Sequence, residues 1–190
     1  MANSYCAAVR TMDSESVHKK YHDNEYGFPI DDDNLLFERL ILEINQAGLS
    51  WSTILNKKEN FEKAFHEFNI STVALYKEKD VNRLLNDAGI IRNRLKIAAA
   101  IENAKRIRTL QKRYRSFKQW LDHHHPQTKE NWVKIFKETF LFTGVEIINE
   151  FLMSTGYLPG AHDKNCPVYK IILKQSPPWS LSVSKPAGQV

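Results

Sequence analysis

The most constraining feature of the sequence is an apolar helical stripe that ends in a carboxylate. Between residues 36 and 44, leucine, isoleucine and phenylalanine recur at helical spacing, so one face of a helix is expected to be buried. Glu43 follows Leu40 by three residues and points toward the same apolar side. Burying an unpaired carboxylate is costly, so Glu43 needs a partner or a changed protonation state. With Gly48 as a helix C-cap and Trp51 close behind, the segment favours a pocket for a planar ligand. The alternatives are a solvated Glu43 and a Trp51 that belongs to the core.

Helical periodicity runs through most of the chain, whereas the alternation typical of strands is rare. The sequence therefore predicts an all-α fold. Residues 31–33 supply N-cap chemistry for the helix that carries Glu43, and the segment before about Pro29 reads as polar and irregular. The further expected helices lie at about residues 61–68, 80–88, 90–110, 117–121, 132–139 and 145–155.

Length and composition indicate a globular chain with one domain. The sequence has 190 residues, of which 42% are hydrophobic and 26% are charged. We expect one domain over residues 1–174, with two helical lobes and the pocket between them, and a loosely ordered tail over 175–190. No apolar run is long enough for a membrane span or resembles a signal peptide, which favours the cytoplasm. The net charge of +5 is compatible with a nucleic-acid partner.

Two cysteines and two histidines have the residue types of a closed metal site. His162 and Cys166 have a spacing that lets both reach one ion, and Cys6 and His22 would complete a tetrahedral set. Four protein ligands leave no position for water, so the predicted role of a zinc ion there is structural, tying the N- and C-terminal segments together. Two inert thiols are the alternative, and the histidine run 123–125 reads as a solvated loop.

The segment from Phe140 to Thr155 has the pattern of helix, glycine turn and helix. Backbone N–H groups of Thr143, Gly144 and Val145 at the start of the second helix are candidates for phosphate binding. A plain connection between two helices is the alternative.

Together these segments resemble the 3-methyladenine DNA glycosylase I family, within the helix-hairpin-helix DNA glycosylases. The similarity runs from Cys6 to Cys166. The segments that carry it, in order, are Tyr21-His22-Asp23-Asn24-Glu25-Tyr26-Gly27-Phe28-Pro29, Glu43-Ile44-Asn45-Gln46-Ala47-Gly48-Leu49-Ser50-Trp51, Asp87-Ala88-Gly89-Ile90-Ile91-Arg92, Phe142-Thr143-Gly144 and His162-x-x-x-Cys166.

The resemblance implies a base-excision-repair enzyme of the bacterial cytosol, acting as a monomer on double-stranded DNA with alkylated bases. It implies hydrolysis of the N-glycosidic bond of 3-methyladenine, without a lyase step, after the base is flipped into an aromatic pocket. Glu43 takes the catalytic position, Tyr21 and Trp51 contact the base, and Gly48 and Leu49 fill the gap in the duplex. The structural zinc would be held by Cys6, His22, His162 and Cys166.

Three positions depart from the family pattern, which usually has aromatic residues there: Ala8 and Tyr26 replace tryptophan, and His18 replaces tyrosine. A pocket with less aromatic wall predicts a relaxed choice of base, unless His18 or a tail residue such as Trp179 refills the space. The alternative function is a zinc-stabilised protein that binds damaged DNA with weak activity or altered lesion specificity. A zinc hydrolase requires an open metal position, which four protein ligands deny.

Overall fold

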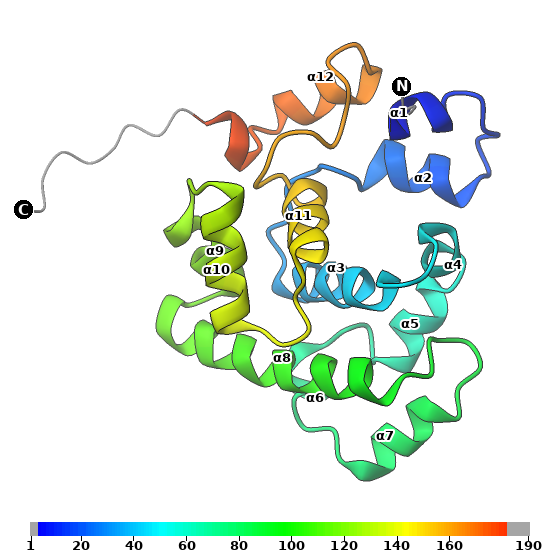
Figure 1. Ribbon diagram of the computed structural model, residues 1–190, viewed down its shortest axis with the longest axis vertical. Helices are drawn as coiled ribbons and strands as arrows, with labels where there is room; N and C mark the ends of the chain where they lie inside the picture. The colour runs from blue at the N-terminus through cyan, green and yellow to red at the C-terminus, as the bar shows by residue number, and fades with distance from the viewer. Residues whose placement is uncertain (1–3, 182–190) are drawn as a thin grey trace, which may run out of the picture.

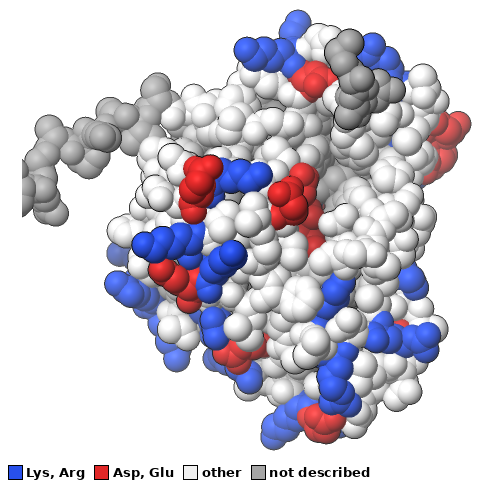
Figure 2. Space-filling model, in the orientation of Figure 1, with Lys and Arg blue, Asp and Glu red and all other residues white. Residues whose placement is uncertain are grey.

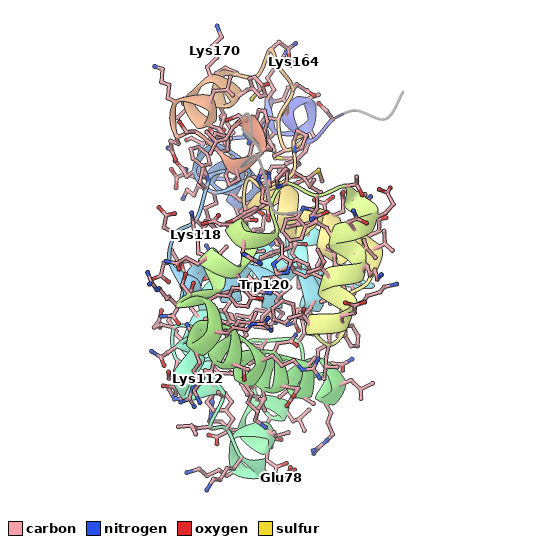
Figure 3. All side chains as sticks on the ribbon, turned by 90° about the vertical axis from the view of Figure 1, so that its left-hand side faces the viewer. Glu78, Lys112, Lys118, Trp120, Lys164 and Lys170 are labelled. Atoms are coloured by element: carbon pink, nitrogen blue, oxygen red, sulfur yellow. The ribbon has the colours of Figure 1, made fainter. Side chains whose placement is uncertain are left out.

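The computed structural model describes residues 4–181, which form helices and turns without a strand. The all-α prediction is confirmed for this part of the chain. Figures 1 and 3 show α1, α2 and α12 at one end of the molecule and α7 at the other, with Lys170 and Glu78 marking the two ends in Figure 3. The helices are α1 (Tyr5–Val9), α2 (Val17–Asn24), α3 (Asp33–Gln46), α4 (Trp51–Leu55), α5 (Lys58–Ala64), α6 (Ile70–Val73), α7 (Glu78–Leu85), α8 (Arg94–Tyr114), α9 (Phe117–His124), α10 (Lys129–Thr139), α11 (Val145–Ser154) and α12 (Pro167–Lys174), followed by the 3-10 turn η1 (Pro178–Ser180).

Helix α3 is the centre of the fold, and it packs against α4, α6, α8, α9 and α11. Residues 36–45 are all buried, so the helix is covered on every side and not on the single predicted face. A helix in that position is normally apolar all round, yet Glu38, Arg39 and Glu43 lie in this run. Each of these charged side chains therefore needs a partner or a cavity.

The two ends of α3 follow the predicted chemistry. Asp32 is the N-cap, and its carboxylate accepts hydrogen bonds from two N–H groups of the first turn. The helix ends at Gln46, and Gly48 turns the chain with a φ of 80°, a conformation that favours glycine. Lys96 from α8 reinforces this end, because its Nζ donates to two main-chain carbonyls there, each 2.8 Å away.

The N-terminal segment is helical where the sequence indicated irregular structure. Residues 5–9 and 17–24 form α1 and α2, and Ser4 caps α1 by accepting a hydrogen bond from the N–H of Ala7. Helices this short carry too few apolar repeats to be recognised by periodicity. The same reason explains why the short helices α6 and α12 are not predicted.

The predicted helix over residues 61–68 is too long. Helix α5 ends at Ala64, and His66, Glu67 and Phe68 follow with φ values of 54°, 53° and 50°. Phe65 and Phe68 stack with their ring centroids 5.5 Å apart. Their spacing therefore reflects a packed aromatic turn and not a continuing helix.

Helices α10 and α11 are joined by a turn that α8 holds in place. The side chain of Asn103, fully buried on α8, accepts from the N–H of Leu141 at 2.8 Å and donates to its carbonyl at 3.1 Å. Phe142 adopts a φ of 60°, and Gly144 is the N-cap of α11 without a side-chain hydrogen bond. The first N–H groups of α11 are thus left without a side-chain cap.

After α12 the chain continues into η1, where the ring of Trp179 lies 6.0 Å from that of Tyr169. Residues 182–190 of the predicted tail lie outside the described residues. Within residues 4–181, the helices are too short or too polar to cross a membrane.

Candidate functional site

A cavity of about 550 Å³ opens between α2, α3, α4 and α11. Its walls are largely aromatic, and three of its polar groups are carboxylates. Glu43, the predicted base-contacting rings and His18 all lie on this cavity, whereas Ala8, which was expected at its wall, does not. The lining residues are Tyr5, His18, Tyr21, Tyr26, Glu43, Gln46, Trp51, Glu146 and Glu150.

Glu43 lies at the inner end of the cavity and is only 4% exposed. Within residues 4–181 its carboxylate has no hydrogen-bond partner and no ion pair. Burial raises its pKa to about 8, a rise that the positive charge of Arg39 limits and the carboxylate of Glu150 increases. The alternative of a solvated Glu43 is thereby removed, and the carboxylate is available to a ligand in the cavity.

Arg39, which the sequence analysis did not select, fixes one wall of the cavity. It lies on α3 one turn before Glu43, and its Nη1 donates to Tyr21 Oη at 3.1 Å. Its guanidinium also lies 4.9 Å from the centre of the Tyr21 ring. Glu25 accepts from Arg39 at 3.2 Å and from Lys58 at 2.7 Å, so the buried arginine is itself held by charge. A basic residue inside an apolar helical stripe was the signal for this role.

The aromatic rings of the cavity pack on one another, two pairs edge to face and the Tyr21–Tyr26 pair tilted by 37°. Trp51 and Tyr21 have ring centroids 5.2 Å apart at an interplanar angle of 63°. Tyr26 contacts Tyr21 at 5.6 Å and Tyr5 at 5.5 Å. Such pairs hold the rings at fixed angles, so the walls are preorganised for a flat ligand.

Tyr5, which the sequence analysis did not select, also lines the cavity. Its hydroxyl lies 3.1 Å from His18 Nδ1, and His18 Nε2 lies 2.7 Å from Ser52 Oγ. Ala8 is exposed and does not line the cavity, and Trp179 lies against Tyr169, outside it. Of the two predicted replacements, His18 is on the cavity and Trp179 is not.

The predicted DNA-contacting residues lie in turns around the cavity. The backbone turns at Gly48, where an added Cβ would meet nothing within 4 Å, and the next side chain, Leu49, is 39% exposed. Val145 is exposed and is followed by Glu146, which lines the cavity. Thr143 is buried, and its hydroxyl donates to the carbonyls of Phe136 and Phe140 at 3.4 Å. The two turns therefore present exposed groups from the ends of helices that form the cavity walls.

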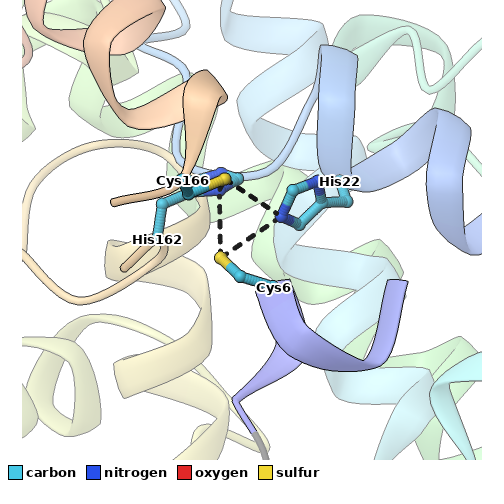
Figure 4. A group of neighbouring side chains, drawn as sticks. All are labelled: Cys6, His22, His162 and Cys166. Atoms are coloured by element: carbon cyan, nitrogen blue, oxygen red, sulfur yellow. Dashed lines mark hydrogen bonds between the residues drawn. The ribbon is translucent and has the colours of Figure 1, made fainter. Parts of the chain in front are cut away.

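The four predicted metal ligands come together in one buried group, drawn in Figure 4. Their ligand atoms all lie within 4.8 Å of one another. Cys6 Sγ is 3.3 Å from His22 Nε2 and 3.6 Å from His162 Nδ1, and Cys166 Sγ is 3.8 Å and 3.7 Å from the same atoms. Ligands of a tetrahedral zinc ion are about 3.4–3.8 Å apart, given the usual Zn–S and Zn–N bond lengths. The donor set and its spacing thus fit zinc.

The outer atoms of both imidazoles are also arranged for metal binding. His22 Nδ1 lies 2.7 Å from Asp23 Oδ1, and His162 Nε2 lies 2.7 Å from the carbonyl of Tyr26. When each outer nitrogen donates its proton, the inner nitrogen keeps a free lone pair facing the thiols. Burial raises the pKa of the Cys6 thiol to about 11 and lowers the pKa of His162. A cation between the sulfur atoms would offset the cost of holding thiolate charge there.

With this geometry in place, comparison with known proteins decides the family. The profile of the methyladenine glycosylase family matches residues 11–139. The chain belongs to this family. The matched residues include Tyr21, Tyr26, Glu43 and Trp51 and end before α11.

Relatives of the methyladenine glycosylase family cover different shares of the chain. DNA-3-methyladenine glycosylase 1 of Escherichia coli K12 is 50% identical over 94 residues, which are half of each chain. DNA-3-methyladenine glycosylase of Haemophilus influenzae is 33% identical over 172 residues, covering 80% of this chain and 92% of the relative. The solved structure of 3-methyladenine DNA glycosylase I from Staphylococcus aureus, described as the structural basis of 3-methyladenine recognition, is similar to this chain with a TM-score of 0.75 and 31% identity. The match covers 82% of this chain and 93% of that one.

The protonation of the buried Glu43 leads to a prediction about stability. We expect the unfolding free energy of the wild type, relative to Glu43→Gln, to fall as the pH rises from about 4.5 to about 8. Folding raises the Glu43 pKa, so above pH 4.5 the unfolded chain releases a proton that the folded chain retains. The fall is at most about 1.4 kcal/mol per pH unit and ends above the folded-state pKa.

Urea unfolding of both proteins at closely spaced pH values measures this difference. Glu78→Gln provides the control, because Glu78 is an exposed glutamate that pairs with Arg94 at 3.1 Å and lies outside the cavity. If the difference in unfolding free energy between wild type and Glu43→Gln stays constant over this pH range, Glu43 is not protonated in the folded chain.

Proposed function

We propose that this chain is a DNA glycosylase that removes 3-methyladenine from alkylated double-stranded DNA by hydrolysis, without cutting the strand. The observation that carries the proposal is a cavity of aromatic rings around the unpaired Glu43 carboxylate, in a chain that belongs to the methyladenine glycosylase family. The relatives named above are DNA-3-methyladenine glycosylases, and the Staphylococcus aureus protein is described for 3-methyladenine recognition. An aromatic cavity with an acid suits a flat, cationic base.

The reaction needs the base outside the duplex, since its bond to the sugar is shielded inside the stack. In the cavity Trp51 and Tyr21 supply aromatic faces, and Glu43 supplies an acceptor for the edge of the base. Methylation at N3 gives the base a positive charge, which favours the ionised form of Glu43 once the base is bound.

The bond between C1′ of the sugar and N9 of the base then breaks, and its electron pair moves to N9, which neutralises the base. Water adds to C1′ and loses a proton. The enzyme accelerates this step by holding the leaving base and stabilising the oxocarbenium-like sugar with the carboxylate of Glu43. Among residues 4–181 no lysine lines the cavity, and Lys96 donates to two carbonyls, which supports hydrolysis over a covalent lyase step.

The DNA backbone would contact the turn between α10 and α11, as in a helix-hairpin-helix element. The N–H groups of Gly144 and Val145 lie at the uncapped start of α11, where the helix dipole favours a phosphate. Figure 2 shows lysine and arginine side chains over the lower half of this face, around a central region with acidic side chains. Phosphates are attracted to the basic surroundings, and the cationic base to the acidic centre.

A structural zinc ion would be held by Cys6, His22, His162 and Cys166. All four coordination positions of a tetrahedral ion would be filled by protein, so the ion would supply rigidity and no chemistry. Tyr5 and Tyr21 each precede a ligand directly in sequence, so the ion would also support two walls of the cavity.

Leu49, at the exposed turn after Gly48, is proposed to fill the space that the flipped base leaves in the duplex. We expect Leu49→Ala to reduce 3-methyladenine release from duplex DNA by about tenfold, because unstacking a base costs a few kcal/mol that an inserted apolar side chain offsets. Binding of free 3-methyladenine, measured by tryptophan fluorescence, is expected to be unchanged. Leu95→Ala is the control, since Leu95 is 70% exposed and lies on α8, outside the cavity. If base release falls equally in Leu49→Ala and Leu95→Ala, Leu49 has no specific role in base flipping.

The second candidate function is binding of damaged DNA with weak excision. It is favoured by the departures from the family's aromatic residues at Ala8, His18 and Tyr26. Release of free bases from methylated DNA, identified by chromatography, separates the two functions. Release of 3-methyladenine with an intact sugar–phosphate strand supports the proposed hydrolysis. Tight binding without release supports the second candidate.

A further inference from the structure

The wall of the cavity opposite the aromatic rings of α2 and α4 is acidic. Glu146 and Glu150 lie one turn apart on α11, and both line the cavity that also contains Glu43. Figure 2 shows acidic side chains over α11 in the middle of the face. Helix α11 lies beyond the residues matched by the family profile, so this acidic wall is a feature of the structure and not of the match.

Glu150 is the inner of the two and is held in place. Its Oε2 accepts a hydrogen bond from Tyr26 Oη at 3.2 Å. Tyr26 is itself fixed, because its ring packs between those of Tyr5 and Tyr21 and its carbonyl lies 2.7 Å from His162 Nε2. The carboxylate is therefore positioned on the cavity by a side chain that cannot easily move.

Glu150 also forms no ion pair within the described residues, although the charge of Lys129 acts on it from a greater distance. Within residues 4–181, no lysine, arginine or histidine forms an ion pair with Glu150, with Glu146 or with Glu43. Burial raises the pKa of Glu150, and the nearby carboxylate of Glu146 adds to the rise. Carboxylates that are desolvated and unpaired are costly, and a cationic ligand between them relieves that cost.

We propose that Glu150, positioned by the hydroxyl of Tyr26, is a specificity-determining residue that selects bases carrying a full positive charge, acting with Glu43 across the cavity. The inference rests on the proposed function and names its substrate class: cationic alkylated purines, in preference to neutral altered bases such as hypoxanthine. A neutral base in the cavity removes water from the Glu150 carboxylate without supplying an opposite charge, so its binding is disfavoured. A cationic base forms an ion pair with the carboxylate, which compensates for the lost water.

The test compares binding of two small probes at neutral pH, measured by calorimetry and by tryptophan fluorescence. The 3,9-dimethyladeninium ion carries a permanent charge, and 9-methyladenine is neutral. In Glu150→Gln the amide oxygen still accepts from Tyr26, and only the charge is lost. We expect affinity for the cation to fall about tenfold, since a charge pair in a partly buried site is worth at least that factor. Affinity for 9-methyladenine is expected to stay equal or rise.

Two further variants guard against a purely structural effect. Tyr26→Phe removes only the hydroxyl that holds Glu150 and is expected to lower the ratio of cation to neutral affinity in the same direction. Glu146→Gln changes an exposed carboxylate at the outer end of the wall, where solvent screens its charge, and is expected to change the ratio least. Thermal unfolding of each variant shows that the fold is retained.

The inference is overturned if Glu150→Gln leaves the ratio of cation to neutral affinity unchanged, which includes the case in which the affinity for both probes falls equally. The proposed function is judged separately by base release from methylated DNA. If the wild type releases the base but Glu150→Gln leaves the ratio of cation to neutral affinity unchanged, the proposed function stands and Glu150 does not select the base. If the ratio of cation to neutral affinity depends on the charge of Glu150 but no base is released, Glu150 selects cationic ligands and the proposed function is wrong.

Discussion

Glu43→Gln is expected to slow 3-methyladenine release under single-turnover conditions by about a hundredfold, the usual effect of removing one preorganised electrostatic group from an active site. The glutamine keeps the shape of the side chain and one acceptor, but it has no charge to stabilise the cationic base or the developing charge on the sugar. Affinity for undamaged DNA is expected to stay nearly unchanged, because the proposed phosphate contacts lie at the turn before α11 and not in the cavity.

Rapid-quench measurement with enzyme in excess over methylated DNA gives the rate directly. Glu38→Gln is the matched control, since Glu38 is also a buried glutamate of α3 but faces Lys58 and does not line the cavity. It is expected to lower stability without slowing release. A Glu43→Gln enzyme that is as fast as the wild type would take Glu43 out of the chemistry.

Cys166→Ala is expected to abolish metal binding and to lower the unfolding free energy by more than about 4 kcal/mol, the range typical of losing a structural metal. Elemental analysis of protein purified without a histidine tag is expected to find about one zinc per chain in the wild type and none in the variant. A chelator is expected to lower the melting temperature of the wild type, because the ion binds the folded chain in preference to the unfolded one.

The control is His123→Ala, a change in the histidine run that lies outside the four-residue group. It is expected to retain the metal and the wild-type melting temperature. The zinc assignment fails if wild-type protein free of metal is as stable as loaded protein and Cys166→Ala melts at the same temperature.

The inward position of Glu43 could be predicted because it depends on local helical spacing alone. Its full burial could not, since periodicity describes one helix face, whereas α3 is covered on all sides by helices from distant parts of the chain. Metal-ligand chemistry is also visible in sequence, because cysteine and histidine are few and their types restrict the choice.

The parts of the site that escaped the sequence analysis are those that depend on tertiary packing. Tyr5 lies in a helix of five residues, too short to show a period, and it contacts His18 and Tyr26 from other segments of the chain. Glu150 meets Tyr26 across 124 residues, a contact that no local pattern indicates. Both line the cavity of Glu43 only because the fold brings distant segments of the chain together.

The joining of the two ends at Cys6, His22, His162 and Cys166 sets an order of events during synthesis. Cys6 and His162 are 156 residues apart, so a ribosome working at roughly 5–20 residues per second leaves the first thiol waiting roughly 8–30 seconds for its partners. During that interval Cys6 cannot contact His162 or Cys166, so the buried group of four closes only after nearly the whole chain has been made. Closure of this group is therefore expected to be a late step in folding.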